Sequence, residues 1–509
     1  MRSFTSTVGN WIRGYAHKPI GVWVMALGAL MTLGYAPFHI WPLAVASLAG
    51  LWWLVKNAQS RKQVLGATLV WGMGHQLTAL YWLPWAFFKD SGGSWLSAIG
   101  GGVPAVVGLA LYGSLAFMIA ALLAWQTGRR WNWYAGATVF VLAWVTLEFV
   151  KGLHPMGFPW LPLGAMWAYS VPLMQGAALG GVWLLSTLIL TFAMLMHGGR
   201  RGVTAACALL VIVWGVGLYR VANMTVASKA ERGNLIRVVQ PNIQSAHKWD
   251  AQLRWQFLQE TMQVALAGDP SMTTPPTVIM PETAVAFYLD REEDVRRALT
   301  DQIAARMPQG SGLVTGTVHS ETDAAGVTHY FNSMAVMDTR GVLRSRYDKR
   351  LLVPFGEYIP ARSWLEALPM PMTLRTFSQS RIDFTHGNRS GLLPTPAGYG
   401  LALICYEGIF PLQVGLDAPE ARYLINITND GWFTGTIALY QHAALTRLRA
   451  VETGLPVVRA ANTGITLVFD GLGREIGRLP INTATYMDIV LPEPLEETPF
   501  LKMLHRLFG

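Results

Sequence analysis

The second half of the chain holds three side chains whose types together could perform acyl transfer: Glu282, Lys349 and Cys405. A thiol can act as a nucleophile, a carboxylate as its base, and an ammonium can stabilise the oxyanion that forms during attack. Each residue follows or precedes a short apolar run, at 278–280, 351–356 and 401–404. A lysine beside such a run should be partly desolvated, and its charge would help to hold Cys405 as a thiolate.

Each of these residues also has a structural interpretation when it is taken alone. Cys405 could be a core cysteine, Glu282 a turn residue and Lys349 a surface lysine; the presence of all three motifs in one chain favours catalysis. The other cysteine, Cys207, lies in an apolar run at 204–213 and is interpreted as an inert small hydrophobe. Two cysteines imply no disulfide framework.

Two polar segments downstream receive structural interpretations. His442 begins a predicted helix, where we expect it to cap or pack, because no other His or Cys stands at metal-ligand spacing from it. The segment 429–431 (Asn-Asp-Gly) predicts a turn after a strand. No metal site is therefore predicted.

The composition indicates a membrane protein. The chain of 509 residues is 52% hydrophobic and only 14% charged, whereas roughly 25% charged residues are usual in soluble domains. The net charge of +9 is not concentrated in one basic tract. We therefore exclude nucleic acid as a partner and expect anionic lipid head groups as the counter-charge.

Seven apolar stretches in the first half have the roughly 17–25 residues that a membrane span requires. They lie at about 19–35, 38–55, 64–86, 97–125, 134–150, 171–197 and 203–222. Basic residues gather on one side of these spans, at Arg2, Arg13, Lys18, Lys56, Arg61, Lys62, Arg129, Arg130, Arg200 and Arg201. The positive-inside rule then places the N-terminus in the cytoplasm and everything after residue 223 in the periplasm of a Gram-negative bacterium. The predicted location is the inner membrane, with several spans.

Tryptophans are frequent near the predicted span ends. We interpret them as an interfacial aromatic belt, and the alternative is that some of them shape a groove for lipid entry. They are Trp41, Trp52, Trp53, Trp82, Trp85, Trp131, Trp133 and Trp160. The loop at 151–167 is rich in Pro, Gly and aromatic residues, which predicts an interfacial segment beneath the soluble domain.

After residue 223 the chain becomes more charged and its apolar runs shorten. Strands are predicted at 235–239, 277–280, 312–318, 333–337, 401–404, 423–428, 466–469 and 485–490, with helices at 251–267, 292–306 and 441–453. This alternation is typical of a layered α/β or α+β domain. We predict a transmembrane domain at 1–223, a catalytic domain at 224–495 and a short tail at 496–509.

At this point the motifs resemble a known family. The Glu282, Lys349 and Cys405 motifs resemble those of the nitrilase superfamily, and the membrane half narrows the resemblance to the apolipoprotein N-acyltransferase family. Matching segments run along nearly the whole chain. They include 36–38, 41–43, 157–160, 240–243, 248–249, 353–358, 405–407, 429–433, 441–442 and 459–466.

The resemblance implies an α+β architecture, with a seven-helix transmembrane bundle and a periplasmic αββα sandwich. It implies a ping-pong reaction in which a phospholipid such as phosphatidylethanolamine donates its sn-1 acyl chain to Cys405 as a thioester. The α-amine of a diacylglyceryl-modified lipoprotein cysteine then accepts the chain. Glu282 would be the general base and Lys349 the oxyanion stabiliser, with the Tyr406 N–H.

The resemblance also assigns supporting roles. Glu357 would orient Lys349 or relay protons, Tyr406 and Glu407 would support the nucleophile, and Trp249 would contact substrate on a mobile loop. No metal or organic cofactor is implied, and the protein is expected to be a monomer.

Three departures from the family pattern are visible. Met280 replaces a usual Trp, which we expect to change packing rather than chemistry, and Ala438-Leu439 replace a usual Gly-Pro in a loop near the nucleophile. The family pattern ends in an eighth span, whereas 496–509 is too short to cross roughly 30 Å of hydrocarbon. We predict an amphipathic tail there. Its lipid-facing residues would be Phe500, Leu501, Leu504, Leu507 and Phe508.

Two other functions stay open, and the departures favour the first of them. One is a membrane-tethered nitrilase-like amidase, or an acyltransferase paralogue with a different acceptor. The other is a membrane scaffold that has kept the fold without the activity, although the presence of all three motif residues argues against it.

Overall fold

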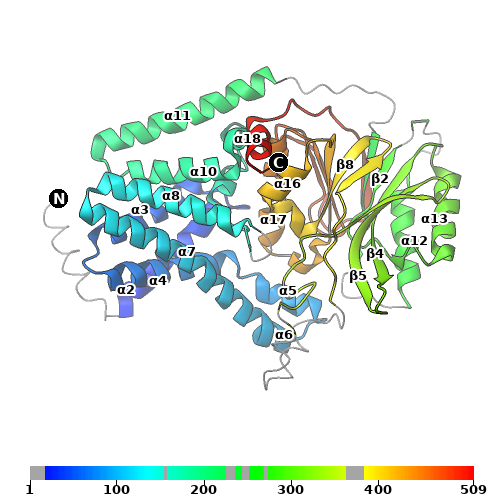
Figure 1. Ribbon diagram of the computed structural model, residues 1–509, viewed down its shortest axis with the longest axis horizontal. Helices are drawn as coiled ribbons and strands as arrows, with labels where there is room; N and C mark the ends of the chain where they lie inside the picture. The colour runs from blue at the N-terminus through cyan, green and yellow to red at the C-terminus, as the bar shows by residue number, and fades with distance from the viewer. Residues whose placement is uncertain are drawn as a thin grey trace.

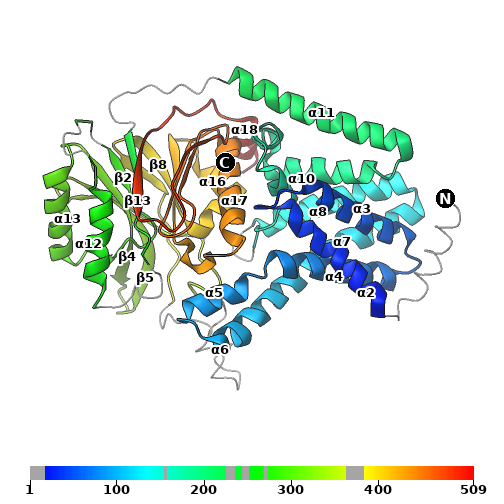
Figure 2. The same ribbon diagram turned by 180° about the vertical axis from the view of Figure 1, so that it is seen from behind.

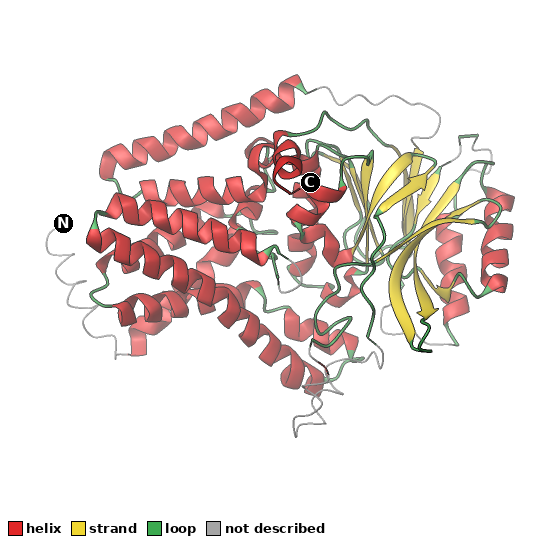
Figure 3. Cartoon of the chain, viewed as in Figure 1, coloured by secondary structure: helices red, strands yellow, loops and turns green. Residues whose placement is uncertain are grey.

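The computed structural model describes residues 18–153, 157–224, 235–243, 252–268, 273–274, 276–360, 362 and 383–508. A helical half and a half built on two sheets lie side by side, and helices α16 (Pro411–Asp417) and α17 (Ala438–Thr453) stand between them (Figures 1 and 2). The C-terminus lies near this junction. Colouring by secondary structure separates the two halves clearly (Figure 3).

Seven helices of the first half overlap the predicted spans. They are α2 (Lys18–Leu30), α3 (Trp41–Asn57), α4 (Arg61–Ala79), α7 (Val103–Arg130), α8 (Trp133–Lys151), α10 (Ala177–Leu195) and α11 (Gly199–Asn223). Among the described residues, four helical stretches are long and apolar enough to cross a membrane: Trp95–Arg130, Trp133–Lys151, Ala177–Leu195 and Gly199–Asn223. The protein is thus a membrane protein, and the count of seven spans stays a prediction.

Shorter elements connect these helices. They are η1 (Met31–Gly34), α5 (Leu83–Asp90), α6 (Trp95–Ser97), η2 (Ala98–Gly102), η3 (Leu163–Trp167) and α9 (Val171–Met174). Side-chain caps start several helices; the Ser60 hydroxyl accepts from the N–H of Gln63, and Asn132 accepts from that of Ala135. Helix α10 is broken at Gly180 and Gly181, where Gly181 has a φ of 65° that disfavours a side chain.

The interfacial interpretation of the tryptophans is wrong for several of them. Trp52, Trp82 and Trp160 are buried, because they pack against other aromatic rings inside the protein. Trp131, by contrast, is exposed.

The first sheet has the strand order β13-β1-β2-β4-β5-β6, with β3 paired to β4. Strands β1, β2 and β4 are parallel to one another, whereas β4–β5, β5–β6 and β1–β13 are antiparallel. The bounds are β1 Leu235–Gln240, β2 Thr277–Ile279, β3 Val285–Tyr288, β4 Gly312–Thr322, β5 Thr328–Asp338, β6 Leu343–Asp348 and β13 Thr485–Val490.

The second sheet has the order β12-β11-β10-β9-β8-β7, and β8, β9 and β10 are parallel. Its strands are β7 Leu392–Thr395, β8 Gly398–Ile404, β9 Tyr423–Thr428, β10 Val457–Ala461, β11 Leu467–Phe469 and β12 Glu475–Arg478. Two 3-10 helices, η5 (Cys405–Ile409) and η6 (Asp430–Phe433), follow β8 and β9. Turns at the carboxyl ends of parallel strands meet at one edge of a sheet, where α/β domains bind ligands.

The two sheets pack face to face, with helices on both outer faces. Val238 and Val314 of the first sheet belong to the same buried cluster as Ile404, Ile425 and Val458 of the second. On the outer face of the first sheet lie α12 (Arg254–Ala265) and α13 (Glu293–Arg306), which bury Leu258, Val295 and Leu299 among others.

Helices α16 and α17 cover the other outer face. Their buried side chains, such as Leu445 and Leu448, belong to one cluster with Leu424 of the second sheet and with Leu185 and Ile189 of α10. The hydrophobic core of the membrane half therefore continues into the sandwich.

The prediction that the tail faces lipid is wrong for three of its five apolar residues. The tail forms α18 (Pro499–Phe508), and Phe500, Leu501 and Leu504 are buried. The Phe500 ring lies 5.9 Å from the ring of Trp183 in α10, and it fills the space beside Gly181. Leu507 and Phe508 are exposed, as predicted.

Candidate active site

Cys405 stands at the end of β8, where the strand turns into η5. Its φ is 51°, a left-handed conformation that is costly for a residue with a Cβ. Burial raises the pKa of the Cys405 thiol to about 12, and the charge of Glu282 acts in the same direction, whereas Lys349 and a hydrogen bond from Thr428 oppose it. Lys349 thus favours the thiolate, as expected, but burial and the charge of Glu282 outweigh it, so the thiol is neutral near pH 7.

Glu282 lies just beyond β2 and is buried. Its Oε1 accepts a hydrogen bond of 2.8 Å from Nδ2 of Asn332, and its Oε2 accepts one of 2.8 Å from the backbone N–H of Asn429. The second contact joins the two sheets, because Asn429 follows β9. The carboxylate is therefore held in one orientation.

Lys349 follows β6 and is almost fully buried, which confirms the predicted desolvation. Its Nζ lies 2.9 Å from Oε1 of Glu357 and 3.7 Å from Oε1 of Glu282. Burial alone would lower the pKa of Lys349, but the carboxylates of Glu357 and Glu282 outweigh it and raise the pKa above its usual value. The lysine is therefore a permanent cation beside the thiol.

Asn332, on β5, is a site residue that the sequence did not reveal. Its Nδ2 donates both to Glu282 and to Oε1 of Glu357, each over 2.8 Å. The Lys349 N–H also donates to the Asn332 carbonyl over 2.8 Å. The side-chain amide of Asn332 thus bridges the carboxylates of Glu282 and Glu357, which lie on either side of Lys349.

Glu407 ties the Cys405 turn to the Lys349 segment. Its Oε1 accepts from the Tyr347 hydroxyl over 2.6 Å and from the Arg350 N–H over 2.8 Å, and its Oε2 accepts from the Ile404 N–H over 2.8 Å. Burial raises the pKa of Glu407, against the opposing effect of these donors. Its supporting role for the nucleophile stays a prediction.

Tyr406 connects the nucleophile turn to the membrane half. Its hydroxyl donates to the carbonyl of Gly157 over 3.1 Å, and its ring stacks 6.4 Å from that of Phe158. Trp249, the predicted substrate contact, lies outside the described residues.

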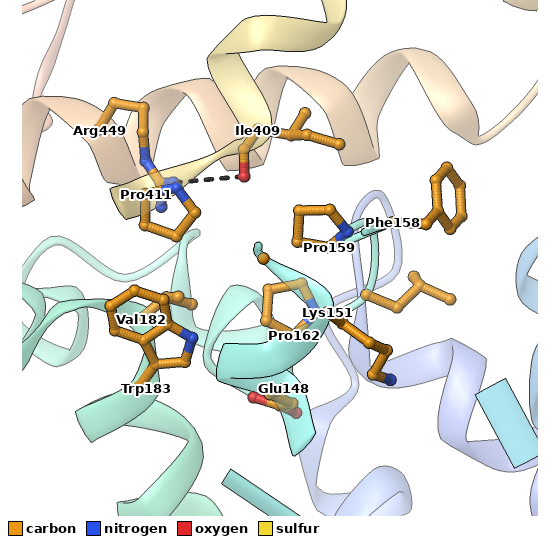
Figure 4. Close-up of a pocket in the computed structure, with 12 residues that line it drawn as sticks. Glu148, Lys151, Phe158, Pro159, Pro162, Val182, Trp183, Ile409, Pro411 and Arg449 are labelled. Atoms are coloured by element: carbon orange, nitrogen blue, oxygen red, sulfur yellow. Dashed lines mark hydrogen bonds between the residues drawn. The ribbon is translucent and has the colours of Figure 1, made fainter. Parts of the chain in front are cut away.

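A small pocket opens at the junction of the two halves (Figure 4). It is lined by Glu148 and Lys151 of α8, by the loop at 158–162, and by Ile409, Pro411 and Arg449 of the sandwich. Arg449 donates to the Ile409 carbonyl across it. Glu282, Lys349 and Cys405 do not line this pocket.

Comparison with known proteins gives the family. Residues 27–195 match the model of the apolipoprotein N-acyltransferase N-terminal domain, and residues 235–492 match that of the carbon-nitrogen hydrolases. An apolipoprotein N-acyltransferase of Brucella melitensis is 34% identical over 92% of this chain and 88% of its own length. This chain belongs to the apolipoprotein N-acyltransferase family.

Other relatives agree with this membership. The apolipoprotein N-acyltransferase of Brucella suis is 35% identical over 92% of this chain and 88% of its own length, and that of Rhodopseudomonas palustris is 31% identical over 94% and 90%. Among solved structures, an amidase from Nesterenkonia sp. is 17% identical, covers 56% of this chain and 100% of its own, and has a TM-score of 0.36. The nitrilase-like fold rests on the family match and on the two sheets.

The departures from the family pattern have structural counterparts. Met280 is fully buried in the core beneath α12 and α13, which agrees with a change of packing. Ala438 and Leu439 form the buried first turn of α17. Neither position contributes a polar group to the site.

Proposed function

We propose that this protein moves an acyl chain from a phospholipid to the N-terminal amine of a diacylglyceryl-modified lipoprotein, through a thioester on Cys405. The supporting observation is the burial of Lys349 between Glu357 and Glu282, with its charge acting on the Cys405 thiol. The names of the relatives support lipoprotein N-acylation as the overall reaction.

In the first half-reaction, Glu282 removes the proton of the Cys405 thiol as the sulfur attacks the sn-1 ester carbonyl. A base is required because the thiol is neutral near pH 7. The C–S bond forms, the ester C–O bond breaks, and the lysophospholipid leaves with the proton. Lys349, with the backbone N–H of Tyr406, stabilises the oxyanion.

In the second half-reaction, the α-amine of the lipoprotein attacks the thioester. Glu282 accepts the proton of the amine and returns it to the departing Cys405 sulfur, so that an amide is formed and the thiol is restored. Glu357 holds Lys349 in place through its 2.9 Å contact. We assign Trp249 a contact with substrate and Glu407 the support of the Cys405 turn.

The proposal includes a membrane arrangement. Residues 1–223 form the transmembrane domain with seven spans, 224–495 the catalytic domain in the periplasm, and 496–509 a short amphipathic tail. The protein acts as a monomer in the inner membrane.

The test is the mass of the purified full-length protein after incubation with phosphatidylethanolamine. We expect an added acyl mass on the wild type and on Cys207→Ala, and none on Cys405→Ala. A diacylated lipopeptide should discharge this adduct and become triacylated.

Two outcomes would contradict the proposal. An adduct that only water discharges would favour the amidase or a paralogue with another acceptor. The absence of an adduct on folded wild-type protein would exclude phosphatidylethanolamine as the donor.

A further inference from the structure

A cluster of fully buried polar residues lies behind Cys405, on the side of α17. The cluster consists of Asn426 on β9, Asp430 on η6, His442 on α17 and Arg459 on β10. Their hydrogen bonds run to one another, to the Cys405 carbonyl and to neighbouring groups of the second sheet and α17. The acyl-transfer steps proposed for the site give these four residues no task.

Two members of the cluster hold the carbonyl of Cys405. Nε2 of His442 lies 3.2 Å from this oxygen, and Nδ2 of Asn426 donates to it over 3.3 Å. The carbonyl belongs to the residue whose φ of 51° is costly. Such a conformation persists only where neighbouring groups fix it, and two donors on one carbonyl do so.

The surroundings of His442 determine which ring nitrogen carries the proton. Burial, and then the charge of Arg459, lower the pKa of His442 below its usual value, although Asp430 opposes them, so the ring is neutral. The Cys405 carbonyl can only accept, so Nε2 must carry the single proton. Nδ1 is then an acceptor for Nη2 of Arg459, which lies 3.2 Å away, nearer than Oδ1 of Asp430 at 3.3 Å.

Arg459 and Asp430 hold the two donors in place. Nη2 of Arg459 lies 2.8 and 2.7 Å from the oxygens of Asp430, while Nη1 donates to Oδ1 of Asn426 over 2.6 Å. Because Oδ1 of Asn426 accepts from the arginine, its Nδ2 must point toward Cys405. The ion pair thus fixes the orientation of both donors.

The membrane half completes the support of His442. The ring of Trp160 lies 5.5 Å from the ring of His442, and Nε1 of Trp160 donates to Oε1 of Gln441 over 2.8 Å. Trp160 belongs to the loop between α8 and η3.

We propose that His442 is a positioning residue for Cys405: its Nε2–H holds the Cys405 carbonyl, and thereby the left-handed turn that directs the thiol toward Glu282 and Lys349. This role rests on the proposed function of Cys405 as the nucleophile. The interaction lies on the backbone, so it affects where the sulfur stands and not how the lipid binds.

The test compares two variants of His442 in full-length protein in which Cys207→Ser leaves Cys405 as the only thiol. His442→Gln keeps an amide N–H near the position of Nε2, whereas the side chain of His442→Asn is too short to reach the carbonyl. A third variant, Asn426→Asp, keeps the acceptor for the arginine and removes the other donor. Each is assayed for alkylation by iodoacetamide, for acyl-enzyme formation from phosphatidylethanolamine at varied concentration, and for thermal unfolding.

We expect His442→Asn to slow alkylation and acylation by about tenfold, with the KM for phosphatidylethanolamine unchanged, because one hydrogen bond to a strained turn is lost. His442→Gln should recover most of both rates, and Asn426→Asp should slow both. Wild-type rates in His442→Asn would overturn the proposal. The proposal would also be overturned if His442→Gln and His442→Asn lost the same fraction of both rates and both unfolded at lower temperatures. The packing of the imidazole ring, and not its N–H donor, would then explain the loss.

The alkylation assay needs no lipid. Wild-type protein could form no acyl-enzyme while His442→Asn still slows alkylation. In that case phosphatidylethanolamine is not the acyl donor, and the positioning role of His442 stands. If His442→Asn does not fold, Asn426→Asp decides: unchanged alkylation in that folded variant would overturn the proposal.

Discussion

The two helical layers of the sandwich occupy equivalent places and have opposite surroundings. Helix α13 buries a single stripe, Val295, Leu299 and Ile303, and turns its charged residues to water. Helix α17 is enclosed between the second sheet and the membrane half, so that even Arg449 and Glu452 are fully buried. One helical layer of the sandwich is therefore an outer surface, and the equivalent layer on the other side is the junction of two domains.

The difference teaches how a polar residue on a helix should be interpreted. On α13, Glu293 and Arg297 form an exposed pair of the kind that contributes little. On α17, several polar side chains have a partner on another element: Gln441 binds Trp160, His442 binds Cys405, and Glu452 binds the N–H of Val182 in α10. The polar residues of α17 therefore mark an interface between elements and not a surface exposed to water.

Removal of the Glu452 carboxylate is the strongest way to test this contrast. In Glu452→Ala, Arg449 would keep a buried charge without its carboxylate, and the Val182 N–H would lose its acceptor. We expect the free energy of unfolding to fall by about 3–5 kcal/mol. The measurement is the unfolding of the full-length protein in detergent, followed by tryptophan fluorescence.

Glu293→Ala on α13 is the matched control for Glu452→Ala. It removes the same side chain from an exposed i,i+4 pair, and we expect a change within about 0.5 kcal/mol. Equal losses in the two variants would show that the layers do not differ energetically.

Helix α18 packs against the α17 layer and gives a second comparison, between its buried Phe500 and its exposed Phe508. Phe500→Ala opens a cavity beside Gly181 and Trp183 and should lower the free energy of unfolding by about 3 kcal/mol. Phe508→Ala removes a ring that is 52% exposed, and we expect a change within about 0.5 kcal/mol. If both variants behaved alike in the unfolding assay, α18 would not be part of this layer.

The contrast between the two halves of the sandwich extends to the site, where the first sheet supplies the charges and the second the thiol. The pKa of Cys405 is raised to about 12, partly by the charge of Glu282. In the Cys207→Ser background, alkylation should therefore rise with pH, about tenfold per unit, without a plateau between about pH 7 and 10. Glu282→Gln removes a negative charge, which lowers the pKa of the thiol and should speed alkylation by about threefold to tenfold at a given pH.

The same substitution should abolish acyl transfer, since the base is lost. Faster alkylation together with lost transfer would separate the electrostatic effect of Glu282 from its catalytic one. Slower alkylation in Glu282→Gln would show that the carboxylate does not raise the pKa of the thiol.

The sequence predicted most of the apolar strands, including β13 at a sheet edge, and it missed β3, β7, the central β10, and the charged edge strands β6 and β12. The runs at 401–404 and 423–428 are built of apolar residues and form β8 and β9. Strands β6 and β12 carry charged residues and lie at the edges of their sheets, where such residues are tolerated and no apolar run marks a strand.

The site was predicted where a motif is local and missed where it depends on packing. Glu282, Lys349 and Cys405 each follow a strand within a recognisable segment. Asn332 lies in the middle of β5, and nothing near it in the sequence indicates that its amide joins two carboxylates. The tail at 496–509 was misassigned for a related reason: its apolar face fits a lipid surface and the junction of α10, α16 and α17 equally well.

The break in α10 at Gly180 and Gly181 has a consequence for the order of assembly. The break exposes the Val182 N–H to Glu452 and makes room for the ring of Phe500. Both partners are synthesised long after α10, because Glu452 lies late in the two-sheet half and Phe500 lies beyond it. A nascent chain whose membrane helices are already inserted therefore lacks the side chain that fills the space beside this kink. The junction of the two halves is complete only once 499–508 has been translated.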